Sequence, residues 1–252
     1  MEAPRNYVNR DYRRLHQGSD LHYFRVQVRE SDLAIGVEQT SWSLDLQEKC
    51  RRELAGLRQE LEGYISLHPD FRTSFSPVRL LPGAPAIAQT MAQAATLAGV
   101  GPMAAVAGAV AQALGEFLAP SSREVVIENG GDLYLRGERE RVIAVFAGTS
   151  PFSFRIGVRI CPQGSALGVC TSSGTVGPSI SLGKADAVII KAQDAALADA
   201  VATSAANRVQ QAEDLMKAVD FAQGISGVAG VLAIKDDKMA AWGEMEIVQL
   251  TR

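Results

Sequence analysis

The heptapeptide Gly168-Val-Cys-Thr-Ser-Ser-Gly174 opens the stretch around which the rest of the chain is arranged, and this stretch ends at Asn207. Its glycines and hydroxyl side chains predict a loop whose free backbone N–H groups can approach an anion closely, because glycine has no Cβ. An apolar run at residues 185–192 predicts a strand, and the segment that begins at Asp194 predicts a helix with Asp194 as its N-cap. The stretch therefore predicts a phosphate-binding loop beside a rigid helix.

Two oxygen-bearing residues of the predicted helix, Asp199 and Thr203, are four positions apart. Residues at this spacing lie on one face of a helix. A carboxylate and a hydroxyl on one face suit Mg²⁺, a hard cation that prefers carboxylate, hydroxyl and phosphate oxygens. The pair therefore predicts a metal site. The same spacing also fits a structural role, in which these side chains cap a neighbouring element or bond the preceding turn.

Composition limits the class of protein and its partners. The chain has 252 residues and a formal net charge of −3, which predicts neither a nucleic acid nor an anionic membrane as a partner. Three cysteines without metal-ligand spacing argue against a disulfide framework and a zinc site, and favour a reducing, cytoplasmic location. The partner expected instead is a small phosphorylated molecule.

Residues 80–115 contain no charged side chain and therefore raise the question of a membrane segment. The run is rich in alanine and glycine rather than leucine, isoleucine and phenylalanine, and glutamines interrupt it. We predict two buried small-residue helices, at about residues 84–97 and 102–118, with Pro102 in the first turn of the second. Helices rich in small residues are also compatible with a homodimer.

Two glycine motifs and one cysteine each allow two interpretations. The tetrapeptide Asn129-Gly-Gly-Asp132 fits either a bulge approached by a ligand or an ordinary hairpin turn. Gly99 and Gly101, before Pro102, fit either an anion-binding helix start or close helix packing. Cys170 fits a nucleophile or a buried structural thiol, and the second is favoured because no neighbour in the sequence would lower its pKa.

The remaining segments come in blocks of strands and helices rather than in strict alternation, which predicts an α+β fold with a mostly antiparallel sheet flanked by helices. We expect one domain over residues 1–252, with residues 77–83 as the only candidate linker. The expected elements are a hairpin of strands 21–29 and 33–37 turning at 30–32, an amphipathic helix at 44–68, an extended connector at 71–83, strands at 123–128, 133–135, 142–146 and 152–160, a helix from 194 to about 223, and a closing hairpin of 228–235 and 239–250 turning at 236–237.

Four stretches, at residues 99–108, 128–132, 171–174 and 198–203, occur in an order that resembles the ApbE superfamily of FAD:protein FMN transferases. The likeness is greatest to the smaller, cytoplasmic ApbE-like branch of that superfamily. The resemblance implies an ApbE-like architecture for the chain. It also implies binding of FAD and Mg²⁺, cleavage of the FAD pyrophosphate, and transfer of FMN to a threonine of a target protein.

The resemblance also implies roles for individual residues. It assigns the metal to Asp199 and Thr203, with a backbone ligand contributed near Gly101 to Ala104. The cofactor-binding residues that it implies are Gly101, Met103, Ala104, Asn129, Gly130, Gly131, Asp132, Thr171, Ser172, Ser173 and Gly174.

One family segment is missing from this sequence. The transferases usually carry His-Ile-x-Asp-Pro-x-x-Gly after the Ser-Gly loop, whereas residues 176–184 contain no histidine. The three histidines, His16, His22 and His68, all lie upstream, so we assign no catalytic residue. Two functions therefore stay open: an Mg²⁺-dependent enzyme that acts on FAD or a related phosphorylated nucleotide, and a protein that binds a flavin or another small anion without chemistry.

Overall fold

The computed structural model of the chain describes residues 20–174 and 182–250. The helices are α1 (Leu44–Leu67), α2 (Asp70–Thr73), α3 (Ala86–Ala98), α4 (Val106–Leu118), α5 (Ala195–Ala206) and α6 (Leu215–Gln223), with the 3₁₀ turns η2 (Pro102–Ala105) and η3 (Ala212–Asp214). The strands are β1 (Leu21–Val28), β2 (Ser31–Glu38), β3 (Val125–Asn129), β4 (Asp132–Arg136), β5 (Arg141–Ala144), β6 (Ile156–Ile160), β7 (Ala166–Ser172), β8 (Ala187–Ala192), β9 (Val228–Lys235), β10 (Lys238–Gly243) and β11 (Glu246–Gln249).

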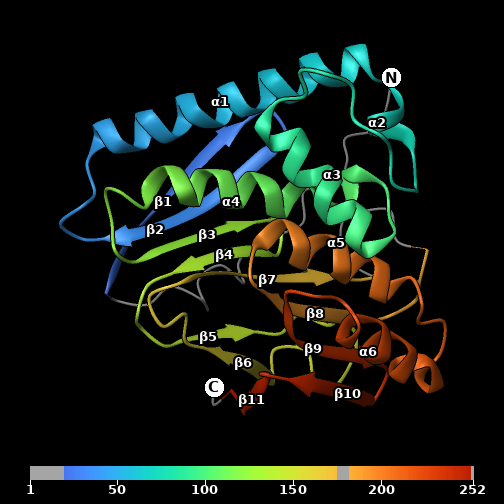
Figure 1. Cartoon of the computed structure of the whole chain (residues 1–252). Coiled ribbons are helices and arrows are strands. Elements are labelled where there is room, and N and C mark those ends of the chain that lie inside the picture. Colours follow the sequence, from blue (N-terminus) through green and yellow to red (C-terminus); the bar gives the residue numbers. More distant parts are fainter. Residues whose placement is uncertain (1–19, 175–181, 251–252) are drawn as a thin grey trace, which may run out of the picture.

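The strands form two antiparallel sheets. The larger has eight strands in the order β1-β2-β3-β4-β7-β8-β9-β10, and the smaller has the order β11-β6-β5. The helices lie over one face of the larger sheet (Figure 1). The predicted α+β class with a mostly antiparallel sheet flanked by helices is confirmed.

Each face of the larger sheet has its own hydrophobic core. The helix-side core joins residues such as Leu54 of α1 and Leu114 of α4 to Ile127 and Ile190 of the sheet. On the opposite face, residues including Leu135, Ile189 and Leu232 pack against Ile143 and Val158 of the smaller sheet. Alternate residues of one strand point to opposite faces of a sheet, so a strand buried on both sides is apolar along its whole length.

Helix α5 lies at the centre of the helical layer and is almost entirely buried. Asp194 caps it as predicted, accepting a hydrogen bond from the backbone N–H of Leu197 at 2.7 Å. Two glycines let neighbouring backbones approach α5 closely, because a Cβ at Gly108 of α4 or at Gly168 of β7 would overlap the backbone of Ala195. The first turn of α5 is thereby held between α4 and the sheet.

One predicted turn and one predicted connector differ from the structure. The first hairpin turns at Arg29 and Glu30 rather than at residues 30–32, and Asp32 pairs with Gln27 inside the ladder. Asp32 is buried there in an ion pair with Arg25, whose Nε lies 2.6 Å from Oδ1, so a polar residue that suggested a turn belongs to a strand. The connector at 71–83 begins within the short helix α2.

The stretch from Gly168 to Asn207 differs in part from its prediction. The loop predicted over residues 168–174 is mostly strand, because Gly168 to Ser172 belong to β7. Thr171 and Ser172 pair there with Ile189 and Val188 of β8. The expected helix at 194–223 is two helices, α5 and α6, separated after Asn207. The side chain of Asn207 accepts a hydrogen bond from the backbone N–H of Leu182, which ties the end of α5 to another segment.

Strand ends also shifted. The strands expected at 142–146 and 152–160 correspond to β5 and the later β6, and the last predicted strand divides into β10 and β11, which belong to different sheets. The amphipathic helix at 44–68 and the closing turn at 236–237 are confirmed.

The uncharged run at 80–115 contains two buried helices, α3 and α4, as predicted. The second helix begins at Val106 rather than at 102, because Pro102 opens the separate 3₁₀ turn η2. Among the described residues, no single helix has the length and apolar character needed to cross a membrane. Within the described ranges, one pair of helices, Ala86–Ala98 and Pro102–Leu118, is long and apolar enough when taken together, but it is bent by 103° and qualifies by length and composition alone.

Candidate functional site

The glycine pair of the tetrapeptide Asn129-Gly-Gly-Asp132 forms the turn between β3 and β4, and Asn129 pairs with Asp132 across it. Gly130 and Gly131 have positive φ values of 71° and 108°, which glycine adopts without strain and which match the twist of a tight hairpin. The hairpin interpretation of this motif is therefore the correct one. The turn places Asp132 at the first position of β4, where its side chain is only 7% exposed.

The side chains next to the turn connect it to the start of α4. The side-chain amide of Asn129 donates to the carbonyl of Ala107 at 3.1 Å. The carboxylate of Glu128 accepts from the backbone N–H of Gly131 at 3.0 Å. Turn and helix start are thereby fixed relative to each other.

Asp199 of α5 points at the N-terminus of α4. Its Oδ2 accepts the backbone N–H of Gly108 at 2.8 Å, and the N–H of Ala107 also hydrogen-bonds to this carboxylate. A helix N-terminus has unpaired N–H groups and favours negative charge, so Asp199 caps α4 from a neighbouring helix. The structural role that the sequence left open for Asp199 is therefore present.

Asp132, Cys170 and Asp199 form one buried acidic cluster, which we call the Asp132–Asp199 cluster. Burial raises the pKa of Asp132 well above its usual value, and the charge of Asp199 raises it further, against opposing hydrogen bonds from Cys170 and the Thr171 backbone. Burial also raises the pKa of Asp199 to about 7, although the N–H groups of Gly108 and Ala107 oppose this. Among the described residues, no lysine or arginine forms an ion pair with either aspartate.

Cys170 is a structural thiol of this cluster rather than a nucleophile. It is fully buried, and its Sγ donates to the carbonyl of Ala195 at 3.3 Å. Burial raises the pKa of the Cys170 thiol, and the charges of Asp132 and Asp199 raise it further. A thiol in these surroundings stays protonated and unreactive.

The donor set of the cluster fits a hard divalent cation. Oδ1 of Asp132 is buried and accepts no hydrogen bond from the described part of the protein. A buried carboxylate oxygen without a partner is costly, and a cation would satisfy it. Within residues 20–174 and 182–250, no group of three or more His, Cys, Asp and Glu side chains is placed to hold a metal. Mg²⁺ does not need such a group, because it binds through one or two carboxylates and completes its shell with water and phosphate.

The other predicted site residues lie at different depths around this cluster. Thr203 is half-buried one turn after Asp199 on α5, and Thr171, Met103 and Ala104 are also half-buried. Ser172 and Ser173 are buried, whereas Gly174 is exposed. Their roles toward a cofactor or metal stay predictions.

Gly101 is held in close packing. A Cβ at this position would overlap the carbonyl of Ser74, so a side chain there would separate η2 from the segment after α2. The carbonyl of Gly101 accepts the N–H of Ala104 at 3.1 Å. The packing interpretation of the glycine-rich junction therefore accounts for Gly101.

The described histidines lie away from the cluster. His22 stacks on Trp42 with ring centroids 4.0 Å apart, and His68 caps α1 beside Tyr64 and Phe71. His16 and residues 175–181, which include most of the region where the resemblance places a histidine segment, lie outside the described residues.

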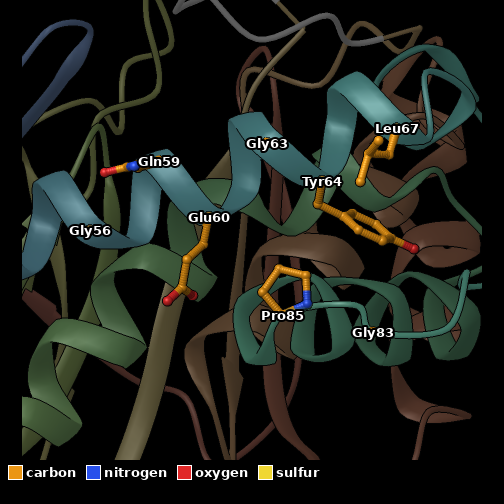
Figure 2. A pocket seen from close by; sticks show the side chains of 8 residues that line it. All are labelled: Gly56, Gln59, Glu60, Gly63, Tyr64, Leu67, Gly83 and Pro85. Atoms are coloured by element: carbon orange, nitrogen blue, oxygen red, sulfur yellow. The ribbon is translucent and has the colours of Figure 1, made fainter.

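A shallow groove of about 500 Å³ runs between α1 and the segment before α3 (Figure 2). Tyr64, Glu60 and Pro85 line it together with Gly56, Gln59, Gly63, Leu67 and Gly83. None of the predicted site residues lines this groove. Its wall lacks a paired carboxylate or an anion-binding loop, so the buried cluster remains the stronger candidate site.

Sequence reasoning missed three contributors to the cluster. Glu128 and Gly108 lie at the ends of the motif stretches 128–132 and 99–108, but neither had been assigned a role. Cys170 had been considered only as a reactive or buried thiol. Gly108 meets Asp199 although the two lie far apart in the chain, and residue spacing carries no signal for such a contact. Glu128 acts locally, on the N–H of Gly131.

Comparisons with known proteins identify the family of this chain and proteins that share its fold. The model of the family described as AbpE bacteria matches residues 13–231. A UPF0280 protein of Methanosphaerula palustris is 41% identical over 220 residues, covering 87% of this chain and 90% of that protein. A UPF0280 protein of Methanocella arvoryzae is 40% identical over 197 residues, covering 78% of this chain and 80% of that protein.

Solved structures share the fold at much lower identity. The flavin transferase ApbE of Vibrio cholerae is 12% identical, with a TM-score of 0.53, and the match covers 89% of this chain and 97% of that one. An ApbE protein of Thermotoga maritima is 13% identical, with a TM-score of 0.51 over 89% of this chain and 97% of that one. The matched family model and relatives, together with the shared fold, show that this chain belongs to the AbpE bacteria family within the ApbE-like superfamily.

Proposed function

We propose that this protein binds FAD together with Mg²⁺ and cleaves the FAD pyrophosphate: water, or a threonine hydroxyl of a target protein, attacks the FMN phosphorus, and AMP leaves. The observation that carries the proposal is the buried Asp132–Asp199 cluster, in which one carboxylate oxygen has no partner among the described residues. Such a cluster calls for a cation, and pyrophosphate is an anion that a carboxylate-bound Mg²⁺ recruits. The solved structures with this fold include flavin transferases.

Each implied residue has a separate task in this proposal. Asp199 and Thr203 hold the metal from one face of α5. The half-buried Thr171 and the end of β7 up to Gly174 lie against the phosphates, and the turn at Asn129–Asp132 closes the opposite side. When bound, Mg²⁺ neutralises charge that develops on the phosphate oxygens and orients the pyrophosphate.

A second candidate is flavin binding without cleavage. The observation that favours it is the absence of a histidine from residues 176–184, where the transferases carry one. Without an acid or base at that position, the protein would hold a flavin or another small anion unchanged.

The proposal also extends to location and assembly. Sparse cysteines and the resemblance support a cytoplasmic protein with one domain, and the small-residue helices leave a homodimer open. The expected partner is a small phosphorylated molecule rather than a nucleic acid or a membrane.

The test is a titration of the chelator-treated protein with FAD, with and without Mg²⁺, followed by mass analysis of the supernatant. We expect Mg²⁺-dependent binding and equal amounts of FMN and AMP. Asp199→Asn should lower turnover by at least about 100-fold, since a metal stabilises the transition state by several kcal/mol. Asp220→Asn, which changes an exposed carboxylate on α6, is the matched control and should leave turnover unchanged.

The two candidates give different results in this titration. Bound FAD that stays intact with Mg²⁺ present would support the second candidate and contradict cleavage. If FAD does not bind under any condition, both candidates fail.

A further inference from the structure

We infer that Asp132 is a direct ligand of the divalent cation and shares one ion with Asp199. The inference rests on the proposed function, and it changes the role that the resemblance implies for Asp132 from cofactor binding to metal binding. The site then consists of two carboxylates from separate elements, the first residue of β4 and helix α5, with Thr203 one turn after Asp199 on α5.

The first argument is the state of the two oxygens of Asp132. The backbone N–H of Thr171 hydrogen-bonds to the carboxylate and favours its charged form. Oδ1 is buried and accepts no hydrogen bond from any described residue. Water does not readily satisfy it either, because Asp132 is only 7% exposed. Buried carboxylate oxygens in folded proteins are nearly always satisfied, so this atom indicates a missing partner.

The second argument is the position of Asp199. Its Oδ2 accepts the N–H of Gly108 at 2.8 Å, which fixes the carboxylate against the start of α4. Helix α5 packs against β4, which places Asp199 and Asp132 in the same buried region. Like charges in a buried site repel each other, and a shared cation removes the repulsion while satisfying the unpartnered oxygen.

The third argument is rigidity. Asp132 follows a turn that Gly130 and Gly131 set and that Asn129 ties to α4. Asp199 lies in the buried helix α5, which the close contact at Gly108 holds against α4. Ligands on such supported elements form a site before the ion arrives, which favours selective binding. Two carboxylates also match the number through which Mg²⁺ binds when substrate phosphates supply further oxygens.

Mn²⁺ provides the test, because the electron paramagnetic resonance signal of free Mn²⁺ reports binding without FAD or turnover. We would titrate chelator-treated wild type, Asp132→Asn, Asp199→Asn and the double variant. Loss of an orienting partner of a ligand typically weakens metal binding about 10- to 100-fold, so loss of a ligand should weaken it at least as much. The double variant should lose less than the product of the two single effects, because both residues hold one ion.

Asp186→Asn is the matched control. Asp186 is another buried aspartate, 3% exposed, but its carboxylate accepts the N–H of Asp236 and pairs with Lys235. This variant should bind Mn²⁺ like the wild type. Thermal unfolding in chelator checks that each variant is folded. If a variant does not fold, infrared difference spectra of the wild type take the place of its Mn²⁺ titration. In these spectra, Mg²⁺ should shift the bands of two carboxylates.

The outcomes separate this inference from the proposed function. If Asp199→Asn loses Mn²⁺ and Asp132→Asn binds it like the wild type, Asp132 is no ligand while the proposed function stands. If the wild type binds no Mn²⁺ and its infrared spectrum does not respond to Mg²⁺, the inference is overturned. A parallel FAD titration without metal then decides whether the protein still binds a flavin.

Discussion

A single side chain, Asp199, caps α4 from a neighbouring helix and also belongs to the buried cluster. We predict that Asp199→Ala unfolds more easily than Asp199→Asn in metal-free protein, because asparagine keeps an oxygen that can accept the N–H of Gly108. The difference should be about 1 kcal/mol, the usual effect of removing a helix cap. Urea unfolding in the presence of chelator measures it. Equal stabilities of the two variants would show that the cap contributes nothing.

The raised pKa values of Asp132 and Asp199 predict a pH dependence of stability for the metal-free protein. Both carboxyls hold their protons more tightly in the folded than in the unfolded state. Their stabilising contribution is therefore complete below about pH 4, the unfolded value, and is lost as the pH rises. For Asp199 this loss is complete once the pH passes its folded pKa of about 7.

The measurement is the difference in unfolding free energy between Asp199→Asn and wild type as a function of pH. The pH-dependent contributions of the other carboxyls cancel in this difference. The asparagine variant should gain stability relative to wild type between about pH 4 and 7. A difference that stays constant over this range would contradict the assignment of the shifted groups.

At the scale of elements, the crossing of α4 and α5 depends on Gly108. A Cβ there would overlap the carbonyl of Ala195 and lie 2.8 Å from Cβ of Asp199, so Gly108→Ala must push the two helices apart. We expect a loss of about 1–3 kcal/mol, as for other overpacked positions, together with weaker Mn²⁺ binding.

The matched control for this substitution is Gly56→Ala in the exposed part of α1, where a Cβ would meet nothing within 4 Å. Alanine is the better helix former, so this variant should gain about 0.5–1 kcal/mol. Chemical denaturation of both variants gives the comparison. A gain at Gly108 as well would mean that the helices are less closely packed than described.

Local patterns identified most elements correctly, and the errors have physical causes. The leucine spacing of α1 and the cap at Asp194 are properties of single segments, so the sequence was sufficient for them. Thr171 and Ser172 were misassigned because hydroxyl side chains occur both in loops and in strands. Here pairing with β8 decides their conformation. A continuous helix was expected over 194–223 because the sequence carries no signal for the hydrogen bond between Leu182 and Asn207, which lies where α5 ends.

At the scale of the whole molecule, strand alternation predicts which face a residue occupies but not which strand is its neighbour. The antiparallel class followed from the order of the elements. The pairing of β4 with β7, and the separate sheet of β5, β6 and β11, depend on contacts between distant segments. The meeting of Asp132 with Asp199 is of the same kind. The sequence therefore supplied the residues of the candidate site but not their grouping.

Ion binding at the cluster should stabilise the entire fold, because the site joins the sheet to the helical layer. A ligand that binds only the folded state adds about 2.7 kcal/mol at 100 times its dissociation constant. We therefore expect Mg²⁺ to raise the melting temperature of wild type, and to do so less in Asp132→Asn. Differential scanning calorimetry measures both. Equal Mg²⁺ effects in the two proteins would place the ion elsewhere.

The buried helix α5 also has a consequence for the order in which the protein is made. The ribosome releases β1 to β4 and α4 long before it releases α5, so the nascent chain first exposes the apolar surfaces that α5 later covers. During that interval the start of α4 has no carboxylate from Asp199. A chain that stalls before residue 195 would therefore expose the apolar face of its sheet. Chaperones and proteases would act on such a chain, and it would not fold as a smaller functional domain.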